Sequence, residues 1–371
     1  MQISNRLRPE WQILKLISIG IEANTKNREL IELFQSPEFS WGELIEQAIL
    51  HRVLPLLAHT ILYKLKSSEL FIPVKIYQHF EQSLELNIYK TKIYRREAAK
   101  IAELLRRNGV IFAGTKGIAY ESTLYQANGS RHLGDIDFMI RPADRSKASN
   151  ILLENGYKQG EYDVATNSVI PHPRETQIAY KLHPDHLLPI AVVTDDLFFK
   201  YIKFDVACSF TWHNSGFDVD MNEMLADTNE QQIPGFEAML PVLNEENAFI
   251  FTILHLFKEA WFFEIWDEIQ QDVNLMKFRD VITLYNNSVK SSQIPSLQNK
   301  IKKYGLTDPF YWVCHHLDNT FGFSLCDSLD LHLAQDPKYL NTAFSNKEKV
   351  AIWKGTMDDR LFAKSKKALF E

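Results

Sequence analysis

Two short stretches decide the fold: Gly114-Thr115-Lys116-Gly117 and, after a spacer of 17 residues, Asp135-Ile136-Asp137-Phe138-Met139-Ile140. The first follows the apolar run Val110-Ile111-Phe112-Ala113, which is typical of a short β-strand, and it precedes a helical pattern from Ile118 to Tyr125. The second alternates polar and apolar residues and predicts another strand. Together they predict a strand, a turn, a helix, a loop and a second strand, which is the start of an α+β unit.

The aspartates of the second stretch carry the strongest chemical signal. Alternate side chains of a strand point to the same face, so we expect Asp135 and Asp137 to project together while Ile136 and Phe138 face a core. Two carboxylates on one face suit a hard divalent cation, Mg²⁺ or Mn²⁺, which also takes oxygen ligands from phosphates. The alternative is an ordinary strand with a solvated edge, because the pattern recurs at Asp218-Val219-Asp220, which lacks a glycine turn and is interpreted as a loop.

The turn before the acidic pair is a candidate phosphate site. A strand-to-helix turn presents free backbone N–H groups at a helix N-terminus, where an anion binds favourably. Either Gly114-Thr115 or Gly117 would allow the close approach, and Lys116 would neutralise phosphate charge. A carboxylate pair beside a phosphate cradle is the equipment for metal-assisted phosphoryl or nucleotidyl transfer.

Helical patterns dominate on both sides of this centre. Residues 1–107 are predicted to be helical and to include a long amphipathic helix from Glu81 to Asn108. Residues 108–230 form the predicted mixed core, and residues 231–371 are again helical. Further strands of the core are expected at Gln177 to Lys181 and at Tyr201 to Phe210. The fold class is therefore α+β, with helical regions flanking a small mixed sheet.

Composition and charge argue against several classes of protein. Hydrophobic residues make up 45% of the chain and the net charge is −6, which is typical of a globular protein and disfavours one that mainly coats nucleic acid. The three cysteines form no CxxC pair, so a zinc or thioredoxin-type site is not expected. Without a signal-peptide pattern or a long apolar run, we expect a cytoplasmic protein with no membrane partner.

Several short motifs occur in an order that points to a known family. In the centre of the chain they are Lys116-Gly117-Ile118-Ala119, Tyr125, Arg131, Gly134 to Ile140, Asp144, Leu152-Leu153 and Gly156-Tyr157. In the flanking regions they are His51-Arg52-Val53, Pro55-Leu56-Leu57, His255, Lys258, Trp261 and Asp272. Together they resemble the uncharacterised nucleotidyltransferases (NTP-transferase type 5) of the polymerase-β-like superfamily, and the resemblance spans most of the chain.

This resemblance implies a nucleotidyltransferase fold and a metal-dependent activity. It assigns Asp135 and Asp137 to Mg²⁺ (or Mn²⁺), and it implies a third carboxylate on a later strand, for which Asp205 is the best candidate. The alternative for Asp205 is a solvent-facing strand residue. The related family often has a histidine two residues after this acid, whereas this chain has Ala207.

The resemblance also implies how a nucleotide such as ATP would bind. Nucleotide contacts are expected from Gly114, Thr115, Lys116, Gly117 and Arg131, and cleft contacts from His255 and Lys258. Arg131 has an alternative as the partner of a nearby aspartate, and His255 as a satisfied buried histidine. The cluster His183-Pro184-Asp185-His186 is interpreted as polar surface.

The expected partners are an NTP and an acceptor of unknown identity. A small molecule or peptide is favoured, with a toxin-like activity on tRNA as an alternative and a catalytically inactive nucleotide-binding module as another. The helix before Asn108 carries seven Lys or Arg residues from Lys90 to Arg107, which would suit RNA phosphates. A solvated helix face explains the same pattern.

Overall fold

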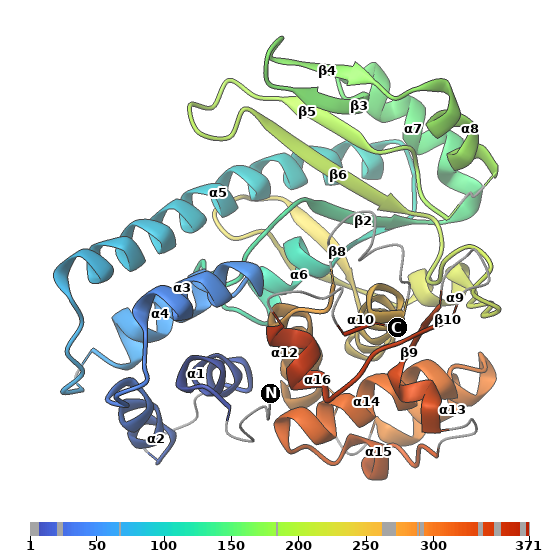
Figure 1. The fold of residues 1–371 in the computed structure, drawn as a ribbon. Coiled ribbons are helices and arrows are strands. Elements are labelled where there is room, and N and C mark those ends of the chain that lie inside the picture. The colour runs from blue at the N-terminus through green and yellow to red at the C-terminus, as the bar shows by residue number, and fades with distance from the viewer. Residues whose placement is uncertain are drawn as a thin grey trace. The chain divides into compact units, whose positions relative to one another are not determined.

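The computed structural model describes residues 7–20, 25–66, 68–182, 185–261, 272–287, 289, 293–332, 337–344, 350–363 and 369–370. Two compact units are present (Figure 1): a helical unit drawn from Met1–Leu84 and Phe249–Glu371, and a sheet unit of Glu85–Ala248. The sheet unit is thus longer at both ends than the segment 108–230 expected for the core. It gains most of the long helix α5 (Val74–Arg107), and after residue 230 it gains the end of one strand and the whole of another.

The sheet unit confirms the α+β prediction. Its elements after α5 are β1 (Phe112–Thr115), α6 (Lys116–Thr123), β2 (Ile136–Ile140), η2 (Pro142–Asp144), α7 (Arg145–Glu154), β3 (Lys158–Asp163), β4 (Ser168–Pro171), α8 (Arg174–Leu182), β5 (Ile190–Val193), β6 (Tyr201–Ala207), α9 (Met221–Ala226), β7 (Thr228–Gln232) and β8 (Met239–Leu243). The strands form one mixed sheet in the order β4-β3-β5-β6-β2-β1-β8-β7. The pairs β2–β6 and β1–β8 are parallel, and the other pairs are antiparallel.

The strands β1 and β2 lie in the middle of this sheet. Every residue of both is buried, as expected for strands covered on both faces. The register places Thr115 opposite Asp137, and Asp137 opposite Asp205 on β6. The centre of the sheet therefore carries one buried carboxylate, Asp137, and a buried charge needs a partner.

One predicted strand is wrong, and some of the observed strands were not predicted. The segment Gln177 to Lys181 lies within the helix α8 rather than a strand. Its apolar residues Ile178 and Leu182 are four apart, which is a helical spacing, and Glu, Gln, Ala and Lys around them favour a helix. The strands β3 and β7 have the polar sequences KQGEYD and TNEQQ, so hydrophobic periodicity does not identify them.

The helical unit confirms the helical patterns predicted at both ends of the chain. Its elements are α1 (Pro9–Ser18), α2 (Thr25–Phe34), α3 (Trp41–Leu50), α4 (Leu54–His59), η1 (Thr60–Lys64), α10 (Glu245–Trp261), α12 (Leu275–Asn287), α13 (Ile294–Lys303), α14 (Thr307–Phe321), α15 (Leu325–Ser328), η3 (Pro337–Asn341), β9 (Thr342–Phe344), β10 (Val350–Ile352) and α16 (Met357–Phe362). The hairpin of β9 and β10 was not predicted. None of the helices in the described ranges is long and apolar enough to cross a membrane.

A histidine on α14 is built into the core of the helical unit. His316 is 5% exposed and packs between the rings of Trp312 and Trp353, with centroid distances of 4.3 and 5.7 Å. Its Nε2 lies 3.0 Å from the carbonyl oxygen of Leu340. Because a carbonyl only accepts, Nε2 carries the proton and donates it. Burial lowers the pKa of His316 from 6.5 to about 3, so the ring is neutral at pH 7.

We expect His316 to make the protein less stable in acid. Between pH 6.5 and about pH 3 the unfolded chain binds a proton at this ring that the folded chain does not. The free energy of unfolding should therefore fall by about 1.4 kcal/mol per pH unit as the pH drops through this window, and be unaffected above it. Urea unfolding of wild type and His316→Gln at several pH values measures the slope. His316→Gln should lose this dependence of the unfolding free energy on pH, whereas His332→Gln, at an exposed position, should keep it.

Candidate active site

The carboxylates predicted to hold a metal converge at the centre of the sheet. Register partners in a parallel pair point to the same face, so Asp137 on β2 and Asp205 on β6 project together from strands about 4.8 Å apart. Asp137 is 6% exposed, whereas the side chain of Asp205 is 37% exposed. Asp135 is exposed and stands just before the first residue of β2.

One ammonium group contacts two of the three acids. Lys116 Nζ lies 2.8 Å from Asp137 Oδ1 and 3.9 Å from Asp205 Oδ2. Burial alone would lower the pKa of Lys116, but the negative charges of Asp137, Asp205 and Asp135 outweigh it and raise the pKa above its ordinary value. Lys116 is therefore fully charged at neutral pH, and the structure places Asp137 and Asp205 against it.

The strand-to-helix turn is made by Lys116 rather than by a glycine. Lys116 has a φ of +44°, a left-handed conformation that costs energy for a residue with a Cβ. Gly114 lies inside β1, where an added Cβ would come within 2.7 Å of Leu240. Gly117 lies in the first turn of α6, where an added Cβ would come within 2.9 Å of both Arg131 Nη1 and Leu133 Cδ2. Thus Gly117 is the glycine that brings the helix N-terminus against the loop before the acids.

The buried side chain of Arg131 fills the space beside Gly117. Its guanidinium carbon lies 5.8 Å from the ring centre of Tyr120 and 6.0 Å from that of Tyr125, and its Nη1 donates to the carbonyl of His132 at 3.3 Å. These contacts fix the arginine next to the predicted phosphate turn. Its role in binding a nucleotide stays a prediction.

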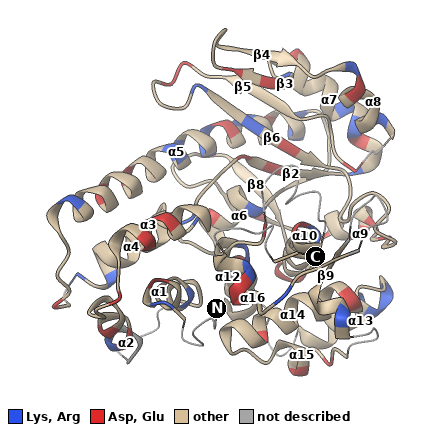
Figure 2. Ribbon diagram, viewed as in Figure 1, with Lys and Arg blue, Asp and Glu red and all other residues tan. Residues whose placement is uncertain are grey.

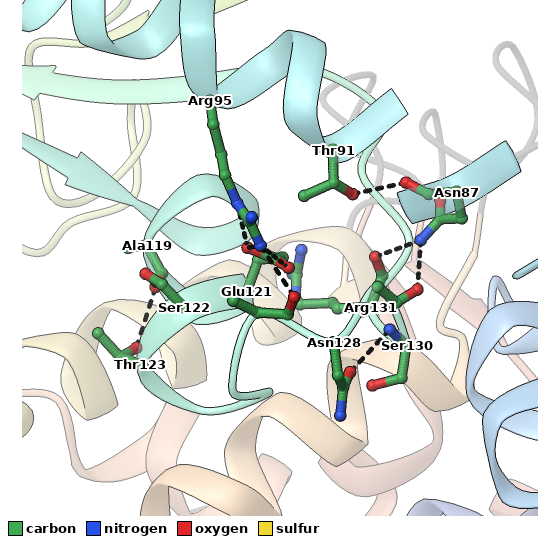
Figure 3. A network of polar contacts seen from close by, with 12 residues as sticks. Asn87, Thr91, Arg95, Ala119, Glu121, Ser122, Thr123, Asn128, Ser130 and Arg131 are labelled. Carbon is green, nitrogen blue, oxygen red and sulfur yellow. Dashed lines mark hydrogen bonds and ion pairs between the residues drawn. The ribbon is translucent and has the colours of Figure 1, made fainter. Parts of the chain in front are cut away.

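Helix α5 holds the loop that leads into β2 (Figure 3). The amide of Asn87 donates to the carbonyl oxygens of Gly129 at 2.7 Å and Arg131 at 2.9 Å. The Tyr94 hydroxyl donates to the carbonyl of Gly134 at 3.2 Å. The long helix predicted before the core therefore positions the backbone just ahead of Asp135.

Helix α5 also holds α6. Arg95 forms a forked ion pair with Glu121 of α6, with Nε 2.9 Å from Oε2, and its Nη2 donates to the carbonyl of Ala127 at 3.2 Å (Figure 3). Both partners are largely withdrawn from solvent, with side-chain exposures of 13% and 1%. This pair fixes the helix whose first residue is Lys116.

His186 lies beside Asp205, which the sequence interpretation does not predict. It was assigned to polar surface, but its side chain is only 21% exposed, and its Nε2 lies 3.7 Å from Asp205 Oδ2. Its Nδ1 lies 3.3 Å from Asp185 Oδ2, while His183 and Pro184 of the same cluster fall outside the described residues.

The backbone explains how His186 reaches the acids. It forms an isolated antiparallel bridge with Ala207, which lies two residues after Asp205. Arg145 of α7 fixes this segment by donating to the carbonyl oxygens of Tyr180 at 2.6 Å and His186 at 2.9 Å.

The two predicted cleft residues lie on α10, in the helical unit. There, His255 Nε2 is 3.0 Å from Glu259 Oε1 on the same helix, one turn later. Lys258 also lies on this helix. Their role beside a nucleotide stays a prediction.

The acidic residues at the sheet suit Mg²⁺ or Mn²⁺ by their donor chemistry. Across the described ranges, no group of three or more His, Cys, Asp or Glu side chains is placed so that it could hold a metal ion by itself. Mg²⁺ does not need one, because proteins usually bind it through one or two carboxylates, with waters and substrate phosphates completing the shell. Asp137 and Asp205 on one face, with Asp135 beside them, provide such carboxylates.

The family model for uncharacterised nucleotidyltransferases matches residues 37–322, which is most of the chain. Comparisons with curated proteins and with solved structures found no match. Membership of such a family implies a transferase that uses an NTP. The chain belongs to the uncharacterised nucleotidyltransferase family.

Proposed function

We propose that this protein transfers a nucleoside monophosphate from an NTP, with Mg²⁺ or Mn²⁺, to a hydroxyl or similar group of a small-molecule or peptidic acceptor. The observation that carries the proposal is the pairing of Asp137 with Asp205 across two central strands, with Asp135 beside them and the Lys116 ammonium among them. Three acids and one cation beside a helix N-terminus match the needs of phosphoryl-type transfer.

Each residue has a distinct part in the proposed mechanism. Asp135 and Asp137 would hold the metal, which when bound neutralises the triphosphate and stabilises charge in an in-line displacement. Lys116 and the backbone N–H of Gly117 would bind phosphate oxygens. Asp205 would share the metal or take the proton of the acceptor hydroxyl. The acceptor oxygen would then form a bond to the α-phosphorus. The bond between that phosphorus and the oxygen that joins it to the β-phosphorus would break, and pyrophosphate would leave.

The charges on α5 favour a small acceptor over tRNA. Acidic residues lie among the basic ones along this helix (Figure 2), and five of the seven Lys and Arg residues from Lys90 to Arg107 have partners inside the sheet unit. These pairs are Lys90 with the carbonyl of Leu133, Arg95 with Glu121, Lys100 with Glu97, Arg106 with Glu230 and Arg107 with Glu103. A helix that tracks phosphates would need these cations directed at the ligand.

Titration calorimetry of ATP, GTP, CTP and UTP with Mg²⁺ tests the proposal. Wild type should bind at least one NTP only when the metal is present, and Asp135→Ala/Asp137→Ala should lose this binding. Metal-independent binding that survives in the double variant would support an inactive nucleotide-binding module instead. A salt-sensitive affinity for tRNA would support the tRNA alternative.

A further inference from the structure

Lys116 contacts two of the carboxylates that would hold a divalent metal. Its ammonium is 2.8 Å from Asp137 Oδ1 and 3.9 Å from Asp205 Oδ2, and its side chain is 18% exposed. A metal ion would bind these oxygens at about 2.0–2.1 Å. Two cations this close to one carboxylate oxygen repel each other strongly, so the ammonium and the metal compete for the acid pair.

We infer that Lys116 is a built-in counter-ion that blocks the acid pair until an NTP arrives, and that its ammonium moves from Asp137 to the triphosphate when metal and nucleotide bind together. The inference rests on the proposed function and deepens it, because it makes binding of the metal depend on the nucleotide.

The position of Lys116 suits such an exchange of partners. Lys116 is the first residue of α6, so the acids and the helix N-terminus that would bind phosphate are both within reach of its side chain. A lysine is a compact point charge on a flexible four-carbon stem, so its ammonium can move while its backbone stays in place. The left-handed backbone at +44° is the kind of strain that is retained at ligand clamps.

Coupled affinities follow from this exchange. In the absence of nucleotide, the metal must displace the ammonium from Asp137 without offering it a new partner. When the triphosphate is present, it takes up the ammonium and the acids become available. The NTP should therefore strengthen metal binding, and by linkage the metal should strengthen NTP binding by the same factor.

Binding of Mn²⁺ alone, followed by the electron paramagnetic resonance signal of the free ion, tests the inference. Lys116→Met should bind Mn²⁺ roughly tenfold more tightly than wild type, because the competing cation is gone. Lys116→Arg keeps the charge and should bind Mn²⁺ as weakly as wild type. Lys203→Met is the matched control, since Lys203 is exposed, lies on β6 two residues before Asp205 and should leave Mn²⁺ affinity unchanged.

Adding an NTP analogue with a methylene group between the α- and β-phosphates completes the test. Mn²⁺ affinity of wild type should then rise, and the difference from Lys116→Met should shrink. Equal Mn²⁺ affinity of wild type and Lys116→Met without nucleotide would overturn the inference and leave Lys116 as a structural counter-ion. Lys116→Gln repeats the comparison if Lys116→Met does not fold.

The two proposals fail in different experiments. If calorimetry detects metal-dependent NTP binding but Lys116→Met gains no Mn²⁺ affinity, only the counter-ion inference fails. If wild type binds no NTP with any metal, the proposed function fails, whereas the comparison of Mn²⁺ affinities still reports on Lys116.

Discussion

Replacing Asp135 by Asn should lower kcat/KM for nucleotidyl transfer by roughly a thousandfold or more, because one carboxylate ligand of the metal is lost. The fold should be unaffected. Asp135 is exposed and lies outside the strand, so its substitution leaves the ladder of β2 intact. The measurement is release of pyrophosphate at saturating Mg²⁺, once an acceptor is known, or metal-dependent NTP affinity before then.

Asp218→Asn is the matched control for this prediction. Asp218 belongs to the same Asp-x-Asp pattern, but Asp218 is exposed in a loop, as predicted. It should therefore change neither NTP affinity nor turnover. Wild-type turnover in Asp135→Asn would show that the acid is an ordinary polar residue beside a strand. Asp137→Asn is a less clean test, because Asp137 is buried and is the ion-pair partner of Lys116.

The centre of the fold could be predicted because its signals are local. A period of two marks β2, and the helical period marks α6 and α5. The pairing of Asp137 with Asp205 is different, because these residues are far apart in the sequence. Alternation within each strand indicates which face a residue occupies, but only the order of strands in the sheet makes the two acids neighbours. The resemblance to a family supplied only the expectation of a third carboxylate on a later strand.

The parts that the sequence did not predict depend on tertiary contacts. The polar strands β3 and β7 are held by pairing with their neighbours rather than by a buried face of their own. The ion pair of Lys116 with Asp137 needs both the left-handed turn and the strand register. His186 reaches Asp205 only because its segment pairs with Ala207. No pattern along the chain encodes these contacts.

Replacing Arg95 by Met should destabilise the sheet unit by about 3–5 kcal/mol, because it leaves the Glu121 carboxylate buried without its cation. The side chain of Glu121 is 1% exposed, and Arg95 contacts it through two guanidinium nitrogens. Urea unfolding followed by circular dichroism measures the change. NTP binding should weaken as well, because Glu121 lies on the helix that begins with Lys116.

Arg107→Met is the control that shows whether the loss of stability depends on burial of the ion pair. Arg107 lies on the same helix and pairs with Glu103, but the two side chains are 73% and 45% exposed, so its loss should cost less than about 0.5 kcal/mol. Arg95→Met/Glu121→Leu should recover much of the stability, since an apolar pair of similar size needs no counter-charge. If Arg95→Met and Arg107→Met lost equal stability, the cost would come from helix α5 itself rather than from a carboxylate left unpaired inside the fold.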